Sequence, residues 1–350
     1  MATDAMTPRE RVLAALALET PDRVPWMEGI VADELASAIV GEQIEINWDI
    51  APDGTFVSSG AGLAEMQKKV CRALAKDNIM WNAFAPIYAG KTHFEGVVAV
   101  GEGLIHTRDD LARMQFPDID APGFLDEARE FIAHKEDFCA VACVRLGIGA
   151  LIMSMGLKAF SYATVDDPDL VEEVLRRYTD WTVDLGPRLA DLGFDVFWAF
   201  DDVAFNSGPM FSPSYFRESV LPIQKEAADA LLSTGRPLIT HSDGDMTSIL
   251  DDWLSLGQHA IHPLQPDVMD IEAVKDRYGD RVCLVGNIAM DDLRQGTPDE
   301  IAAQVRARIE RIGVGGGYIV SSSNSLTADM KVQNILAMRD AILRYGRTQG

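Results

Sequence analysis

Short apolar runs alternate with longer segments of helical spacing along most of this chain. The short runs are typical of buried strands, whereas apolar residues recur every three or four positions in the longer segments. Three of these longer segments begin and end with residues favoured at helix termini, namely 168–193, 212–235 and 297–313. The runs interpreted as strands are residues 24–30, 82–88, 138–149, 194–202, 236–243, 260–267, 281–289 and 317–324.

Strands that alternate with helices predict a parallel sheet, and eight such units close most naturally into a (β/α)8 TIM barrel. We therefore expect one barrel domain over residues 1–350, with an N-terminal helical extension over about residues 1–22. A doubly wound open sheet is the alternative, but no Gly-x-Gly-x-x-Gly follows a predicted strand. The "GVGGGY" segment at 313–318 precedes a strand, which is typical of a turn.

Composition restricts the function classes further. The chain carries 54 acidic against 31 basic residues, a net charge of −23, so binding to nucleic acid or to an anionic membrane is not expected. The start of the chain lacks the basic and apolar regions of a signal peptide. Its four cysteines include no Cys-x-x-Cys pair. Together these features predict a cytoplasmic protein with buried thiols.

Polar residues gather where the predicted strands end. One example is "THSDGD" at 240–245, where an apolar strand is followed by a histidine and two carboxylates within five residues. Each such residue alone could cap a turn or a helix. Because the carboxyl ends of barrel strands build the active site, the recurrence at nearly every strand favours a site. The candidates are Glu28, Tyr88, Arg145, Asp201, Asp202, His241, Asp243, His262, Asn287 and Asn324.

Four blocks of the chain, taken in sequence order, also resemble a known family. They are "TPRERVLAALALETPDRVPW" (7–26), "DDVAFNSGPMFSPSYFRESVLP" (201–222), "GDRVCLVGNI" (279–288) and "GGGYIVSSSNSL" (315–326). They resemble the uroporphyrinogen decarboxylase superfamily, which comprises haem-pathway decarboxylases and corrinoid-linked methyltransferases. The resemblance is weakest over residues 40–80, and it implies a (β/α)8 barrel.

The two branches differ at the strand ends. The decarboxylases follow "RVPWM" with an arginine-rich segment, whereas this chain has Glu28 there. They also place an aspartate after their second strand, where this chain has "FAPIY". An acid in place of cationic contacts would repel a substrate with eight carboxylates. The resemblance therefore favours the methyltransferase branch, with uroporphyrinogen decarboxylase as the alternative and a barrel without catalysis as a third reading.

The same resemblance raises the question of a metal. Members that methylate coenzyme M hold zinc with His-x-Cys and a distant cysteine. Here His241 matches the histidine, but Asp243 and Asn324 stand where the cysteines would be. Oxygen ligands bind zinc less tightly than thiolates do. Two interpretations stay open: zinc held by His241 and Asp243, with Asp201, Asp202 or His262 as extra ligands, or a hydrogen-bonded His241–Asp243 pair without metal.

The expected reaction moves a methyl group between a corrinoid protein and a small molecule. Since the chain lacks the cobalamin-binding Asp-x-His-x-x-Gly motif, a partner protein would supply methylcobalamin. The other substrate would be tetrahydrofolate or a methoxylated or methylated compound, and a homodimer stays open. The expected catalytic residues are His241, Asp243, Asp202 and Asn287, and the expected substrate-binding residues are Glu28, Tyr88, Arg145, Asp201, His262 and Asn324.

Overall fold

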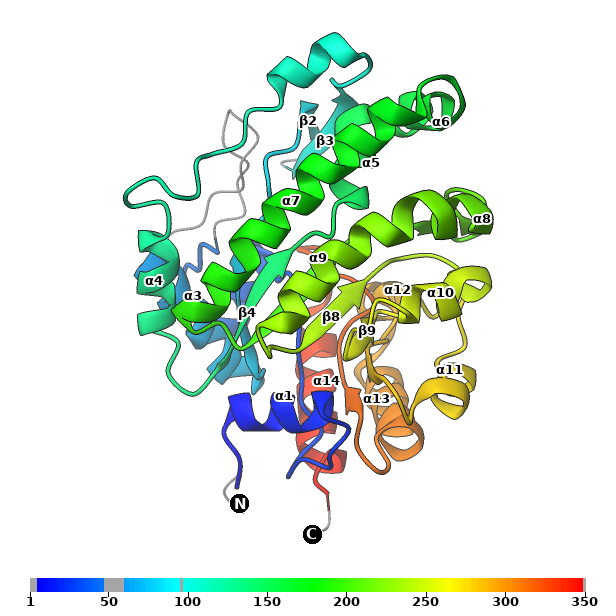
Figure 1. Ribbon diagram of the computed structural model, residues 1–350. Helices are drawn as coiled ribbons and strands as arrows, with labels where there is room; N and C mark the ends of the chain where they lie inside the picture. The colour runs from blue at the N-terminus through cyan, green and yellow to red at the C-terminus, as the bar shows by residue number, and fades with distance from the viewer. Residues whose placement is uncertain (1–4, 47–59, 95–96, 349–350) are drawn as a thin grey trace.

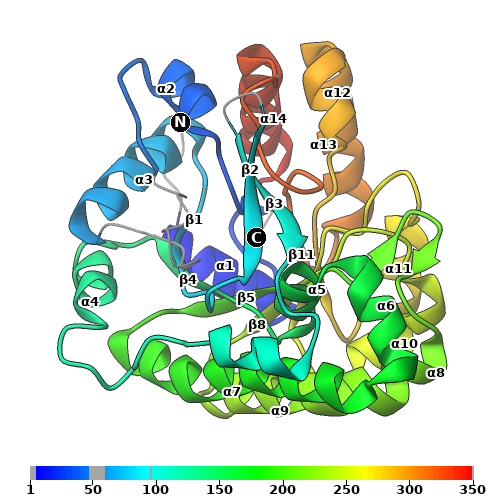
Figure 2. The same ribbon diagram turned by 90° about the horizontal axis from the view of Figure 1, so that it is seen from above.

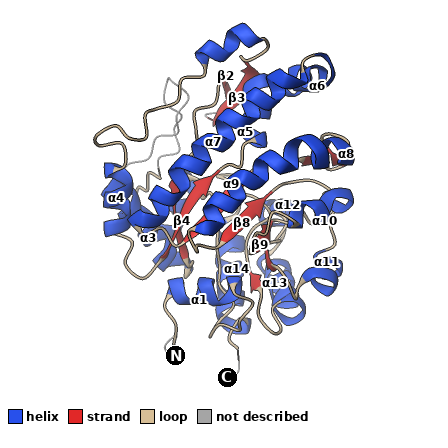
Figure 3. Ribbon diagram, in the orientation of Figure 1, coloured by secondary structure: helices blue, strands red, loops and turns tan. Residues whose placement is uncertain are grey.

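The computed structural model describes residues 5–46, 60–94 and 97–348. Its centre is a curled sheet of seven parallel strands, with helices packed outside it (Figures 1 and 3). The strands, in sheet order, are β1 (Asn78–Asn82), β4 (Cys139–Val144), β5 (Val196–Phe200), β8 (Leu238–His241), β9 (Ala260–His262), β10 (Cys283–Val285) and β11 (Tyr318–Ile319).

Two small hairpins and a set of helices complete the architecture. The hairpins are β2 (Ala89–Phe94) with β3 (Val97–Gly103), and β6 (Ala204–Phe205) with β7 (Gly208–Pro209). The helices are α1 (Pro8–Leu16), α2 (Asp33–Val40), α3 (Gly60–Leu74), α4 (Asp126–Ala133), α5 (Ile148–Met155), α6 (Leu157–Asp166), α7 (Pro168–Leu192), α8 (Pro213–Tyr215), α9 (Leu221–Ser233), α10 (Leu250–Leu254), α11 (Ile271–Tyr278), α12 (Met290–Gln295), α13 (Pro298–Ile312) and α14 (Val332–Tyr345). Short 3₁₀ turns cover Arg108–Arg113 and Thr247–Ile249, and a π-helical turn, Phe216–Val220, joins α8 to α9.

The expected helices form where their end signals lie. Thr297 caps α13 and exchanges hydrogen bonds with Glu300, the capping-box arrangement that satisfies free N–H groups at a helix start. Asp167 caps α7, which ends at Gly193 in the left-handed conformation. These three expected helical segments are therefore confirmed, with the third divided into α8, the π-helical turn and α9.

The prediction of an eight-stranded barrel is confirmed in part. Residues 24–30 form an extended segment instead of a strand: Trp26 pairs with Val320 in a single parallel bridge, and its carbonyl accepts the Asp77 N–H at 2.8 Å. This segment therefore lies between β11 and β1. The strand expected at 82–88 was wrong, because the strand is β1 and residues 83–88 form a loop after it.

The interior of the curled sheet is filled by alternate side chains of the strands. This inner cluster includes Met80 of β1, Val141 of β4, Trp198 of β5 and Ile239 of β8, all buried. Helix α1 packs Val12, Ala15 and Leu16 against the same cluster. In Figure 1, α1 and both chain termini lie at the amino ends of the strands, opposite the β2–β3 hairpin. The carboxyl ends of the strands therefore hold the accessible end of the interior.

The remaining helices surround the sheet, as Figure 2 shows from above. Helices α7 and α9 pack on each other, and so do α13 and α14. Within the described part of the chain, no single helix is long and apolar enough to cross a membrane, and the bent pair α5 and α6 meets that test only jointly.

Candidate active site

The site begins where the inner side chains change from apolar to polar. Successive side chains of a strand point to opposite faces, so Arg145, Phe200, His241 and His262 continue the inner rows of β4, β5, β8 and β9. The register supports this placement, since Phe200 pairs with His241 and His241 with His262. Four neighbouring strands thus present one aromatic and three ionisable side chains at the same level.

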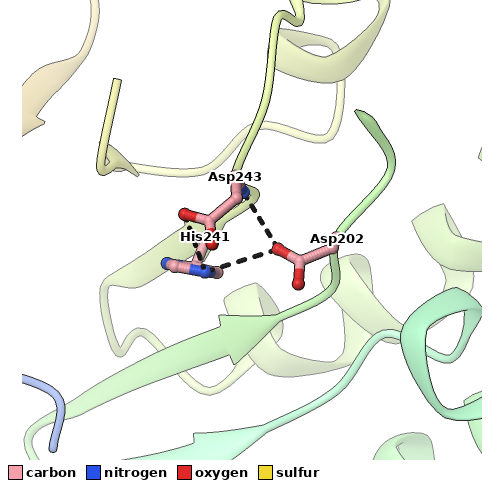
Figure 4. Close-up of side chains that lie close together, drawn as sticks. All are labelled: Asp202, His241 and Asp243. Carbon is pink, nitrogen blue, oxygen red and sulfur yellow. Dashed lines mark hydrogen bonds and ion pairs between the residues drawn. The ribbon is translucent and has the colours of Figure 1, made fainter. Parts of the chain in front are cut away.

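Three residues form the most compact group at this level: Asp202, His241 and Asp243 (Figure 4). The Nε2 atom of His241 lies 3.4 Å from Asp202 Oδ1 and 3.7 Å from Asp243 Oδ1. The backbone N–H of Asp243 donates to Asp202 Oδ1 at 2.9 Å. One candidate ligand atom from each residue lies within 4.8 Å of the others, a spacing that a metal ion can bridge. His241 and Asp243 are thus close but beyond hydrogen-bond distance, and Asp202 is the nearer carboxylate, so the expected His241–Asp243 pair stays a prediction.

A second histidine fixes the orientation of His241. The Nδ1 atoms of His241 and His262 are 2.6 Å apart, and His262 Nε2 lies 3.3 Å from the Ser322 carbonyl oxygen. A carbonyl only accepts hydrogen bonds, so His262 carries its hydrogen on Nε2 and accepts at Nδ1. His241 consequently donates from Nδ1, and its Nε2 faces the two carboxylates. This is the arrangement in which a metal-binding histidine is held by a neighbour.

The surroundings move the pKa values of these groups in opposite directions. Burial lowers the pKa of His241, but the hydrogen bond and charge of Asp202 and the charge of Asp243 outweigh it, so its pKa is raised. Burial and the neighbouring His241 hold the pKa of His262 well below its usual range. Without an ion, a proton on this pair is therefore favoured on His241 over His262.

Asn324 joins the group through Asp243. Its side-chain N–H donates to Asp243 Oδ2 at 2.6 Å. The other oxygen, Asp243 Oδ1, is buried and has no hydrogen-bond partner among the described residues. A buried acceptor left without a partner costs free energy, so this atom marks a place for a ligand. One imidazole nitrogen and two carboxylates form a donor set that fits a divalent ion, and it contains no thiolate.

Glu28 lies behind this group and is fully buried. Its carboxylate accepts from Trp26 Nε1 at 2.7 Å, from the Ser322 N–H at 2.8 Å and from Ser322 Oγ at 2.6 Å. Ser321 Oγ lies 3.4 Å from both Glu28 Oε2 and His262 Nε2. The Ser321 hydroxyl therefore links Glu28 to His262. The hydrogen bonds from Ser322 also hold Glu28 against the segment that follows β11.

Three expected site residues have other partners in this structure. Both oxygens of Asp201 accept backbone N–H groups, from Leu146 and from Gly149, at the start of α5. The Asn287 amide donates to the Leu264 carbonyl at 2.6 Å and accepts from Arg308 of α13 at 3.1 Å. The Tyr88 hydroxyl donates to the Gln115 carbonyl at 2.7 Å. The structure does not bring these side chains into the Asp202–His241–Asp243 group, and their expected roles in binding and catalysis stay predictions.

Arg145 lies beside the group, on the inner row of β4. The neighbouring strand β1 carries a further polar residue that the sequence pattern did not indicate. The missed residue is Asn82, which ends β1 on its inner row and is buried. The strand predicted at 82–88 begins at Asn82, so the pattern does not place this residue at a strand's carboxyl end. The signal was present in "NIMWN", an apolar run that ends in an amide.

Comparison with known proteins places the fold. The model of the uroporphyrinogen decarboxylase (URO-D) family matches residues 104–345, more than half of the chain. The chain belongs to the uroporphyrinogen decarboxylase family. This agrees with the resemblance seen in the sequence blocks.

Individual relatives are more distant. A uroporphyrinogen decarboxylase of Methylococcus capsulatus is 27% identical over 186 residues, covering 51% of this chain and 50% of that enzyme. A uroporphyrinogen decarboxylase of Chlorobium phaeovibrioides is 25% identical over 246 residues, covering 66% of this chain and 68% of that enzyme. The chain thus spans about half the length of the first of these relatives.

Among solved structures, a methyltransferase from Methanosarcina mazei superposes with a TM-score of 0.73 at 18% identity. The match covers 97% of this chain and 99% of that one. At this identity the likeness shows the fold alone. The likeness of fold covers nearly the whole chain.

Proposed function

We propose that this member of the family is a methyltransferase that moves a methyl group between a corrinoid protein and a small molecule. The observation that carries the proposal is the Asp202–His241–Asp243 group, which presents an unpaired carboxylate oxygen at the carboxyl ends of the strands. Methyl transfer needs a nucleophile or leaving group that is polarised at a fixed position. This group supplies that position.

A divalent metal such as zinc fits this donor set, held by His241 Nε2 and one oxygen each of Asp202 and Asp243. The ion would act as a Lewis acid on an oxygen, nitrogen or sulfur atom of the small molecule. His262 holds His241 with Nε2 directed at the carboxylates, and Asn324 holds Asp243 through Oδ2. The chain's own residues thus fix the ligands before an ion binds.

A corrinoid protein must reach the same point, and the exposure of the group fits this requirement. The side chains of Asp202 and Asp243 are 49% and 33% exposed, whereas His241 is 6% exposed. The carboxylates therefore lie at the open side and the histidine behind them. The cobalt of the partner would take up or release the methyl group at that open side. Tetrahydrofolate and methoxylated or methylated compounds are the proposed second substrates.

Metal analysis combined with one substitution tests the proposal. The purified protein is expected to hold about one zinc or other divalent ion, removable by a mild chelator because the ligands are oxygen-rich. His241→Ala should lose the ion and methyl transfer together. If the wild type binds no metal, His241 acts in proton transfer, and His241→Ala should slow turnover by about 10²–10⁴-fold. Full activity in His241→Ala would overturn the role of the group.

Uroporphyrinogen decarboxylase is the second candidate, because the curated relatives carry that name. The structure gives Glu28 four hydrogen-bond donors and no arginine partner, at the position where the decarboxylases place cationic residues. We expect no coproporphyrinogen from uroporphyrinogen in the presence of this protein. Formation at enzyme-like rates would establish decarboxylation instead of methyl transfer.

A further inference from the structure

We propose that Asn82 and Arg145 form a subsite for the carboxylate of the substrate, so that the small molecule is a carboxylate with a flat apolar body. The inference rests on the proposed function for the identity of the site, because it names the class of methyl donor or acceptor. The binding that it describes does not require methyl transfer. The two can therefore fail separately.

The two residues lie on neighbouring strands, β1 and β4. Asn82 pairs with Cys143 in the parallel register, and Arg145 follows Cys143 on the same inner row. Phe200 ends β5, the next strand, and its carbonyl accepts Arg145 Nη1 at 2.9 Å. The subsite is thus built on three adjacent strands, and Asp202 lies two residues after Phe200.

Arg145 has a guanidinium whose hydrogen-bonding capacity is only partly used. Its Nε–H is buried without a partner among the described residues, and it forms no ion pair with any of them. The charged plane lies 4.2 Å from the centre of the Phe84 ring, a cation–π contact that holds it in place. A planar fork of N–H groups that is fixed and only partly hydrogen-bonded matches a carboxylate.

Asn82 adds a second unpaired group. Its side chain is buried, and neither its Nδ2 nor its Oδ1 atom has a partner in the part of the chain that the structure describes. Buried amides are ordinarily hydrogen-bonded, and an amide N–H₂ next to a guanidinium can donate to the same anion. Two buried side chains on adjacent strands thus have polar atoms without hydrogen-bond partners, and both indicate a ligand.

The walls beside the subsite indicate the body of that ligand. The rings of Phe84 and Phe200 meet edge to face with centroids 6.1 Å apart, and the Phe200 ring lies 5.1 Å from the His241 ring. These apolar surfaces lead from Arg145 to the Asp202–His241–Asp243 group. A flat molecule can lie along them with its carboxylate on Arg145 and its methyl-bearing atom at the group.

Calorimetric titration with a matched pair of probes tests the subsite. The probes are 4-methoxybenzoate and 4-methoxybenzamide, which share shape but differ in charge. We expect the wild type to bind the benzoate roughly 10- to 100-fold more tightly. Arg145→Lys and Asn82→Asp should each remove most of this preference, since lysine lacks the planar fork and aspartate repels the anion. Arg176→Gln, an exposed arginine on α7, is the matched control and should keep it.

The outcomes separate the two proposals. Equal binding of both probes by the wild type, or an unchanged preference in both Arg145→Lys and Asn82→Asp with native melting curves, would overturn the subsite. Retained preference without methyl transfer in the wild type would contradict the proposed function and leave the subsite standing.

Discussion

At the scale of single residues, Glu28 is a buried carboxylate whose nearest hydrogen-bond donors are serines and a tryptophan. Burial raises the pKa of Glu28, and the hydrogen bonds from Ser322 and Trp26 and the charge of Lys76 offset only part of that rise. The folded state therefore binds this proton more tightly than the unfolded chain does. Its contribution to stability is fully present below the ordinary pKa and is lost as the pH rises through the folded pKa.

Glu28→Gln should remove this dependence, because glutamine resembles the protonated acid and can still hydrogen-bond to Ser322. We expect the free energy of unfolding of the variant to gain on that of the wild type as the pH rises from about 4 to about 8. Chemical denaturation of both proteins at several pH values measures the difference. A difference that stays constant, or that shrinks with rising pH, would contradict the raised pKa.

Residue identities at strand ends were predictable, but side-chain partners were not. The sequence indicated His241, Asp243, Asp202 and Asn324 because a polar residue follows an apolar strand, and the structure brings them together. Asn287 obeys the same pattern, yet its amide is bound by Arg308 and the Leu264 carbonyl. The direction taken by a side chain just beyond a strand depends on tertiary partners, which a linear pattern does not contain.

At the scale of elements, α1 is held under the sheet by a buried arginine. Arg11 is 1% exposed and donates to Asp22 and Asp77, each at 2.7 Å. Removing one partner of a buried ion pair leaves an uncompensated charge, so Arg11→Met should lower the free energy of unfolding by about 3–5 kcal/mol. Arg306→Gln breaks the exposed pair with Glu310 and should cost about 0–1 kcal/mol. Equal losses in urea denaturation would show that the burial of Arg11 is unimportant.

The β2–β3 hairpin meets α5 at a point of close backbone approach. A Cβ atom on Gly103 would lie 2.3 Å from the backbone of Met155 and Gly156, whereas on Gly90 of the facing strand it would find only ordinary contacts, the nearest at 3.6 Å. Gly103→Ala should therefore cost about 1–3 kcal/mol through overpacking, and Gly90→Ala about 0.5 kcal/mol or less. Thermal denaturation of the two alanine variants compares these costs directly. Similar melting temperatures would mean that the hairpin shifts freely.

The order of strands and helices was predictable, whereas their limits were not. Periodicity located most parallel strands, because buried strands are nearly continuous apolar runs. It failed at 82–88, where "AFAPIY" is as apolar as a strand but follows β1 as a loop. It also missed both hairpins, whose short strands lie outside the central sheet. An apolar loop over a barrel end has the same hydrophobic sequence pattern as a strand, because both are buried.

At the scale of the whole molecule, the net charge of −23 acts on stability. Like charges on a compact surface repel one another, and salt screens that repulsion over a Debye length of about 10 Å at 0.1 M. We expect the melting temperature to rise by a few degrees between about 10 mM and about 200 mM sodium chloride. Scanning calorimetry in a buffer without divalent ions measures this shift. A fall over the same range would mean that attractive ion pairs outweigh the net repulsion.

The helix under the sheet also has a consequence for how the chain is made. Helix α1 leaves the ribosome before the strands it packs against, β1, β4 and β11, and β11 is the last of these three along the chain. The buried face of α1, with Val12 and Leu16, is consequently covered only after these strands have been synthesised. During translation this face is exposed apolar surface, which is what chaperones bind. Helix α1 is thus built before the strands that cover it, and its packing is completed only after β11 has been made.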